Sequence, residues 1–145
     1  LADALMKISY MVCVDEFQHK VFENPEMTAM ERRAVWSGLE KIYMPWRNYA
    51  GNEFLESGAF WIKQQHIFLY PFYYVDYAMA QMGAFEFYTK MKEDRKAAWA
   101  DYYKLCAAGG SMGYFDLLKY SGLHKVLEDG SVKIILKGVF EELGL

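Results

Sequence analysis

The chain has 145 residues, of which 54% are hydrophobic, 18% aromatic and 24% charged. This composition is that of a globular domain with a proper core, and it excludes a disordered or fibrous chain. The formal net charge is −3, without a block of like charges. Nucleic acid and anionic membranes are therefore excluded as main partners, because both select basic patches. We expect one domain over residues 1–145.

Neither a membrane anchor nor a secretion signal is apparent in the sequence. No stretch reaches about 18 consecutive apolar residues, the length of a membrane-spanning helix, and the apolar N-terminal segment lacks a signal-peptide cleavage site. Cys13 and Cys106 stand alone, without C-x-x-C spacing, as is typical of free thiols in a reducing compartment. We therefore expect a cytoplasmic protein. The chain begins at Leu1 with a mid-helix pattern, which predicts a fragment of a longer protein.

The first predicted element is a helix over residues 1–22, because its apolar residues recur at helical spacing. The same face continues through Asp15 and His19, so polar groups extend an apolar stripe. Pro25 ends this helix.

A second helix begins at a capping box formed by Thr28 and Glu31, whose side chains satisfy the first backbone amides. Pro45 ends it. Its buried face is predicted to consist of Val35, Leu39 and Ile42.

The middle of the chain is less regular. Residues 46–58 contain two glycines and two asparagines and indicate an irregular connection. Residues 60–70 indicate a short helix or turn. Pro71 is suited to the first position of a helix, and residues 72–91 are apolar nearly all round, which predicts a buried central helix.

Three further helices are predicted after it. Asp94 caps the first, which ends at Gly109. Its inner face is predicted to consist of Trp99, Tyr102, Tyr103 and Cys106. A short helix follows over residues 113–120. Ser131 is predicted to cap the last one, and its buried face is expected to be Val132, Ile135, Val139 and Leu143. The pattern predicts a compact all-α domain of roughly five to seven helices.

Only three histidines are present, and none of His19, His66 and His124 is followed by glutamate. The zinc motif H-E-x-x-H is therefore absent, and we expect this chain alone to bind no zinc. Glu16 and His19 form one E-x-x-H pair, but a di-iron bundle needs two such pairs and two more glutamates. C-x-x-C-H for haem and a nucleophile elbow are also missing. His124, between Leu123 and Lys125 and near a glycine, is expected in a surface loop.

Asp15, Glu16 and His19 allow two interpretations. They form either a hydrogen-bonded polar layer at a helix junction or a group with a direct catalytic role. Unpaired buried charge is rare, which favours the polar layer.

The segment from His66 to Tyr77 contains one histidine and four tyrosines. Tyr74 and Tyr77 are three residues apart and Tyr73 and Tyr77 four apart, so on a helix each pair shares a face. Buried phenols must find hydrogen-bond partners. The cluster is either an aromatic core with satisfied hydroxyls or a set of neutral donors directed at a developing oxyanion.

Three long stretches of the sequence resemble one family, in colinear order. These are HIFLYPFYYVDYAMAQ at residues 66–81, VDEFQHKVFENPEMTAMER at 14–32 and WADYYKLCAAGGS at 99–111. They are similar to the C-terminal part of the oligoendopeptidase F family, zinc oligopeptidases distantly related to thimet oligopeptidase and neurolysin. The resemblance covers essentially the whole chain.

In this family the zinc ligands, an H-E-x-x-H motif and a downstream glutamate, precede the region that this chain resembles. The resemblance therefore implies the closing part of the enzyme. His66, Tyr74 and Tyr77 match the family's histidine and Tyr-x-x-Tyr group, which binds the substrate backbone and stabilises the tetrahedral intermediate. The glycine-rich turn matches a loop near the substrate channel. The substrate-binding residues implied in this way are Tyr73, Gly109 and Gly110.

The implied activity is metal-assisted hydrolysis of short peptides, with zinc as the cofactor of the full-length enzyme. The implied partners are short peptides and the N-terminal remainder of the same polypeptide. The fragment alone is expected to be inactive. A non-catalytic helical binding module derived from the same family is the alternative, because the missing metal motif fits it equally well.

Overall fold

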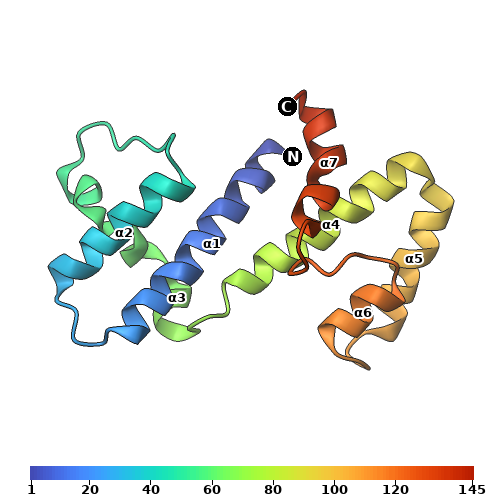
Figure 1. Cartoon of the computed structure of the whole chain (residues 1–145), viewed down its shortest axis with the longest axis horizontal. Coiled ribbons are helices and arrows are strands. Elements are labelled where there is room, and N and C mark those ends of the chain that lie inside the picture. The colour runs from blue at the N-terminus through green and yellow to red at the C-terminus, as the bar shows by residue number, and fades with distance from the viewer. The chain divides into compact units, whose positions relative to one another are not determined.

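The computed structural model describes all residues 1–145, and every regular element is helical (Figure 1). The α-helices are α1 (Ala2–Glu23), α2 (Ala29–Tyr43), α3 (Gln65–Leu69), α4 (Val75–Glu93), α5 (Arg95–Ala108), α6 (Tyr114–Tyr120) and α7 (Ser131–Leu143). A π-helical turn η1 (Leu55–Ala59) and a 3-10 helix η2 (Phe60–Lys63) lie between α2 and α3. The all-α prediction is confirmed. None of these helices combines the length and apolar character that a bilayer span requires.

The chain divides into two compact units. We call them the N-terminal unit, Ala2–Ala78, and the C-terminal unit, which comprises Leu1 and Met79–Leu145. Helix α4 begins in the first and continues in the second. Each unit has a hydrophobic core of its own. The prediction of one domain over residues 1–145 stays a prediction.

The core of the N-terminal unit forms where α1 packs against α2. Its buried residues are Cys13, Val14, Phe17, Trp36, Leu39 and Met44. The rings of Phe17 and Trp36 meet edge to face, with centroids 5.3 Å apart, a geometry worth about 0.5–1.5 kcal/mol beyond the area it buries. Leu39 therefore lies inside as predicted. Ile42 was predicted wrongly: it is 72% exposed, because the buried stripe of α2 continues through Glu40 instead.

The side-chain caps predicted at the N-termini of α2 and α5 are present in the structure. Thr28 accepts a hydrogen bond from the Glu31 amide at 3.3 Å, and the Glu31 carboxylate accepts one from the Thr28 amide at 2.7 Å. The predicted capping box is confirmed. Asp94 accepts from the amides of Lys96 and Ala97 and caps α5, also as predicted. In each case the side chain satisfies amides that the helix leaves unpaired.

The predicted start of the central helix at Pro71 was wrong, since α4 begins at Val75. The reason is Phe72, whose φ of +63° is left-handed and cannot belong to an α-helix. Residues 70–74 therefore form a turn. Two short helical pieces, η2 and α3, occupy residues 60–69 before it, in agreement with the predicted short helix or turn.

In the C-terminal unit the core contains Phe87, Leu118 and Leu123, with Leu105 packed against it. The predicted inner face of α5 was wrong. Trp99 is 59% and Tyr103 67% exposed, and Tyr102 and Cys106 are exposed as well. The helix is rotated so that its small Ala98 is buried, together with the Leu105 side.

The predicted cap of α7 was also wrong. Gly130 occupies the N-cap position with φ +81°, and no side chain caps the helix. Ser131 is instead buried inside the first turn, with Ile135 and Val139 on the same inner face. Val132, predicted to be buried, is exposed.

The close approach of η1 to α2 depends on the absence of a side chain at Gly58. A Cβ atom there would lie 2.1 Å from the carbonyl oxygen of Arg33, and φ is +83°. Gly51 has nearly the same φ, +81°, but open space around it. Gly51→Ala should cost about 1–2 kcal/mol of unfolding free energy from backbone strain. Gly58→Ala should cost about 1–3 kcal/mol more from the added steric clash.

Denaturant unfolding of the two variants measures this difference directly. Equal losses of unfolding free energy in Gly58→Ala and Gly51→Ala would show that η1 does not lie against α2 in the way described.

Candidate functional site

The structure brings together His66, Tyr73, Tyr74 and Tyr77, which we call the His–Tyr cluster. The ring centroid of His66 lies 4.8 Å from that of Tyr74, 5.7 Å from Tyr77 and 6.3 Å from Tyr73. Tyr77 is 5.7 Å from Tyr74 and 5.3 Å from Tyr73. One imidazole and three phenols thus form a continuous aromatic group within the N-terminal unit.

Local backbone geometry builds this cluster. His66 lies in the short helix α3, Tyr73 and Tyr74 in the turn that follows, and Tyr77 in the first turn of α4. The turn is set by Phe72, since a left-handed aromatic residue is unusual and costs on the order of 1–3 kcal/mol. Its ring packs 4.8 Å from His19 and 4.9 Å from Phe22, which offsets that cost.

The cluster has a packed side and an open side. Tyr74 is half-buried, with its ring 5.9 Å from that of Tyr10 on α1. Tyr73 and Tyr77 are 45% and 43% exposed. The open side is therefore accessible to a ligand, while the packed side holds the rings in place. A hollow of about 380 Å³ also borders Tyr74.

The hydroxyls of Tyr74 and Tyr77 are neutral donors at pH 7. Hydrogen bonding with Tyr73 raises the pKa of the Tyr77 hydroxyl. Burial raises the pKa of the Tyr74 hydroxyl. Since the ordinary tyrosine pKa is already about 10, both groups keep their protons and can donate hydrogen bonds.

The remaining predicted site residues, Gly109 and Gly110, lie in the C-terminal unit. Gly109 follows α5 with φ +50°, a left-handed conformation that glycine adopts without strain, and its amide donates to the carbonyl of Leu105. A Cβ at Gly110 would meet open space. Their role in substrate binding stays a prediction.

Asp15, Glu16 and His19 on α1 form contacts of the kind expected for a polar layer. The Tyr43 hydroxyl of α2 donates to Glu16 at 2.6 Å. This bond raises the pKa of Tyr43 to about 12 and lowers that of Glu16. Asp15 lies 3.6 Å from His19. The Tyr43–Glu16 bond joins α2 to α1, whereas the Asp15–His19 pair lies within α1.

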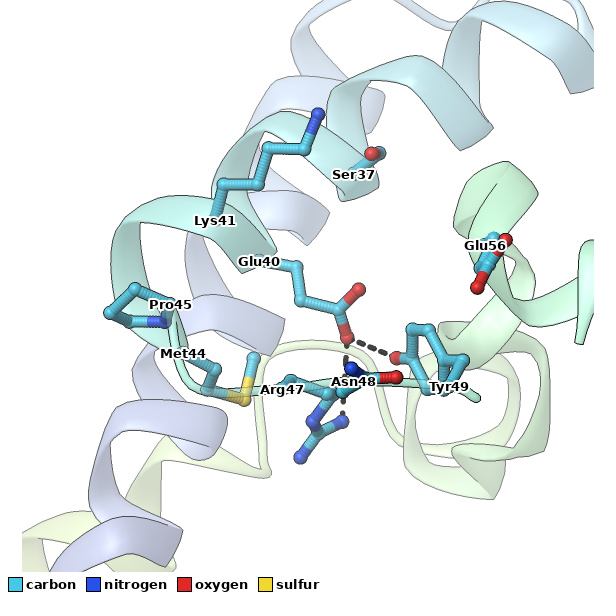
Figure 2. A pocket seen from close by; sticks show the side chains of 9 residues that line it. All are labelled: Ser37, Glu40, Lys41, Met44, Pro45, Arg47, Asn48, Tyr49 and Glu56. Atoms are coloured by element: carbon cyan, nitrogen blue, oxygen red, sulfur yellow. Dashed lines mark hydrogen bonds and ion pairs between the residues drawn. The ribbon is translucent and has the colours of Figure 1, made fainter. Parts of the chain in front are cut away.

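A buried carboxylate that the sequence analysis missed lines a second hollow, of about 350 Å³ (Figure 2). One oxygen of Glu40 accepts hydrogen bonds from the Tyr49 hydroxyl and from Arg47, the latter at 3.4 Å. The signal in the sequence was the place of Glu40 on the same helix face as Trp36.

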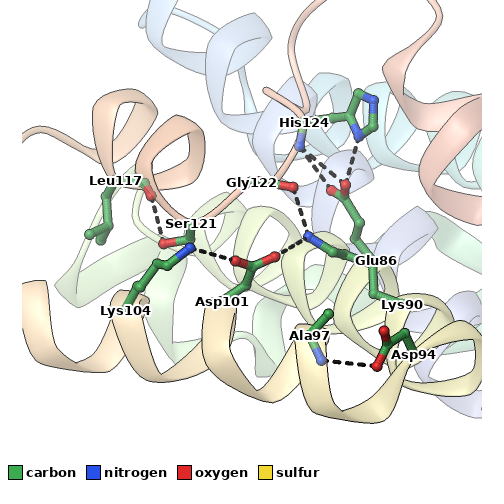
Figure 3. Close-up of polar contacts among 10 residues, drawn as sticks. All are labelled: Glu86, Lys90, Asp94, Ala97, Asp101, Lys104, Leu117, Ser121, Gly122 and His124. Atoms are coloured by element: carbon green, nitrogen blue, oxygen red, sulfur yellow. Dashed lines mark hydrogen bonds and ion pairs between the residues drawn. The ribbon is translucent and has the colours of Figure 1, made fainter.

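A second missed carboxylate, Glu86, anchors a loop of the C-terminal unit (Figure 3). It accepts from the backbone amide of His124 and lies 2.6 Å from its Nδ1. His124 does lie in a loop, as predicted, but it is held by a buried partner. Lys90 also fixes this loop, because its ammonium group donates to the carbonyl of Gly122 at 3.0 Å. The same group donates to the carboxylate of Asp101 on α5 at 2.8 Å.

Metal-binding groups are not assembled in this chain. No three histidine, cysteine, aspartate or glutamate side chains are grouped so that they could hold a metal ion. The chemistry that the His–Tyr cluster offers on its own is hydrogen-bond donation to a carbonyl oxygen or an oxyanion.

Comparison with known proteins gives three similar solved structures. One is described as an oligoendopeptidase F, is 46% identical with a TM-score of 0.93, and the match covers 98% of this chain and 25% of that chain. PZ peptidase A, solved with an inhibitor, is 44% identical, with the same TM-score of 0.93 and coverage of 98% and 25%. An oligoendopeptidase F from Bacillus anthracis is 32% identical with a TM-score of 0.73, over 98% of this chain and 22% of that chain.

No family model matches the chain, and no curated protein matches it. The chain spans 25% or less of the length of the structures that it resembles, which is consistent with a C-terminal portion of that fold. By sequence identity and by fold, nearly the entire chain resembles a portion of the oligoendopeptidase F structures.

Proposed function

We propose that this chain is a C-terminal portion of the catalytic domain of a zinc oligoendopeptidase that hydrolyses short peptides. The observation that carries the proposal is the His–Tyr cluster: protonated phenols and an imidazole on a surface that is open on one side and packed on the other. The similar solved structures are peptidases, which supports peptides as the substrates.

Zinc fits the proposed enzyme but not this chain, which offers no ligand set for it. The ligands are therefore assigned to the remainder of the polypeptide. When bound there, zinc would supply a polarised water for attack on the peptide. The role of the present chain is confined to its own groups, which bind and orient the substrate and donate hydrogen bonds.

In the proposed reaction the Tyr77 hydroxyl donates to the carbonyl oxygen that becomes the oxyanion. Tyr74 and His66 donate beside it, and Tyr73 contacts the substrate on the exposed side. Such donors act mostly in the transition state, where the oxygen carries more charge than in the substrate. Gly109 and Gly110 are assigned to the substrate-binding loop.

The cysteines support a reducing location for the proposed enzyme. Cys13 and Cys106 are both free thiols, and unpaired cysteines are typical of the cytoplasm. We therefore assign the enzyme to that compartment.

Tyr77→Phe keeps the ring and its packing and deletes only the donor. In the full-length enzyme, we expect turnover to fall about 10²-fold or more, the usual effect of losing one oxyanion donor. KM and the melting temperature should change little, because the ring is exposed and a transition-state contact acts mainly on turnover. Steady-state kinetics with a quenched fluorescent peptide gives both constants.

Tyr70→Phe is the matched control. Tyr70 is exposed, lies in the same turn and makes no ring contact with His66, so its variant should keep full turnover. If Tyr77→Phe keeps turnover but lowers the melting temperature, the cluster is an aromatic packing group and not a set of oxyanion donors.

The isolated chain should bind no stoichiometric zinc and hydrolyse no peptide, because it would lack both the metal ligands and the base. Metal analysis and peptidase assays on the purified, tag-free chain check this. One zinc per chain, or chelator-sensitive turnover, would contradict the assignment of the zinc ligands to the remainder of the polypeptide.

A further inference from the structure

The side-chain amide of Gln64 links His66 to Tyr10 on helix α1 of the N-terminal unit. The Tyr10 hydroxyl on α1 donates to Oε1 of Gln64 at 3.0 Å. The amide nitrogen of the same Gln64 lies 2.6 Å from Nδ1 of His66. Tyr10 is 54 residues from Gln64 in the sequence, so this chain of hydrogen bonds is a feature of the tertiary structure.

The direction of these bonds fixes the state of the imidazole. The amide nitrogen of glutamine carries two hydrogens and donates only, so Nδ1 of His66 has to be the acceptor. A neutral imidazole that accepts at Nδ1 carries its hydrogen on Nε2. The Tyr10 hydroxyl donates to Oε1 of Gln64, which leaves the amide nitrogen facing His66. Burial raises the pKa of this hydroxyl, so it keeps the proton that it donates.

Other contacts support a positioning role. Gln64 precedes α3 at its N-cap position, yet its side chain caps no amide of that helix and is turned to His66 instead. The ring of Tyr74 packs against both ends of the hydrogen-bond chain Tyr10–Gln64–His66, with its centroid 5.9 Å from that of Tyr10 and 4.8 Å from that of His66. No ion pair involves His66, so the amide is its one polar contact with a side chain.

We propose that Gln64 and Tyr10 are positioning residues that hold His66 as the Nε2–H tautomer, with Nε2 as a donor toward the substrate. The catalytic consequence of this inference rests on the proposed function, whereas the tautomer itself does not. The opposite tautomer would present a lone pair to the carbonyl oxygen and repel the developing oxyanion. By setting the tautomer of His66, Gln64 and Tyr10 thus determine whether this side chain stabilises or destabilises the transition state.

The tautomer itself is measured without any assay of activity. In full-length protein labelled with 15N-histidine, the His66 signals are assigned from their loss in His66→Ala. We expect Nδ1 to resonate as an unprotonated nitrogen and Nε2 as a protonated one. In Gln64→Glu the carboxylate has no hydrogen to donate, so Nδ1 should become protonated. A protonated Nδ1 in the unmodified neutral imidazole would overturn the proposal.

Kinetics measure the consequence. Gln64→Met, which preserves length but removes the donor, should lower kcat about 10- to 100-fold, the usual effect of losing a partner that fixes a histidine tautomer. KM and the melting temperature should stay nearly constant. Tyr10→Phe should lower kcat less, because Gln64 remains. Gln65→Met is the matched control, since Gln65 is the exposed neighbour, and it should retain full turnover.

His66→Ala separates the two hypotheses. If it leaves turnover unchanged, the catalytic role proposed for His66 fails, whereas the 15N result still reports the tautomer. If His66→Ala lowers turnover but Gln64→Met and Gln64→Glu do not, the proposed function stands and the positioning role is overturned.

Discussion

The ring of Tyr10 connects the core of the N-terminal unit to the His–Tyr cluster. Its centroid lies 6.1 Å from Trp36 in the core, 5.9 Å from Phe60 in η2 and 5.9 Å from Tyr74 in the cluster, each in an edge-to-face arrangement. Its hydroxyl donates to Gln64. One side chain therefore sets the positions of η2, of the turn before α4 and of the amide behind His66. The geometry of the site depends on this packing.

A site for a developing charge needs donors that are fixed before the reaction begins, because reorganisation during the reaction weakens electrostatic stabilisation. In the proposed enzyme, the N-terminal unit would meet this need by placing the cluster between a packed interior and an open surface. The left-handed turn at Phe72 is the local exception to regular structure, and its ring is held by Phe22 and His19. Backbone strain of this kind persists only where surrounding contacts over-determine it.

The sequence was sufficient to predict the helices whose ends carry local signals, such as the capping side chains of Thr28 and Asp94. It was insufficient where two faces of a helix are both apolar. In α5 the large rings, Trp99 among them, were expected inside, but Ala98 lies inside. Periodicity alone cannot choose between two apolar faces, because the choice depends on which one meets a neighbouring element.

The candidate site was predictable in part, for similar reasons. The spacing of the tyrosines, together with the family resemblance, was enough to group His66 with Tyr74 and Tyr77. Gln64 lies two residues before His66 but has no local signal for this contact, and Tyr10 reaches Gln64 only through tertiary packing across 54 residues. The left-handed Phe72 was also missed, because aromatic residues seldom adopt this conformation.

The most direct test of the central claim is a crystal structure of the full-length enzyme with a phosphinic peptide, whose charged oxygen imitates the oxyanion. The account predicts that this oxygen lies roughly 2.7–3.1 Å from the Tyr77 hydroxyl, with Nε2 of His66 also directed at the inhibitor. An inhibitor bound away from the His–Tyr cluster, with these side chains covered by other parts of the protein, would contradict the account.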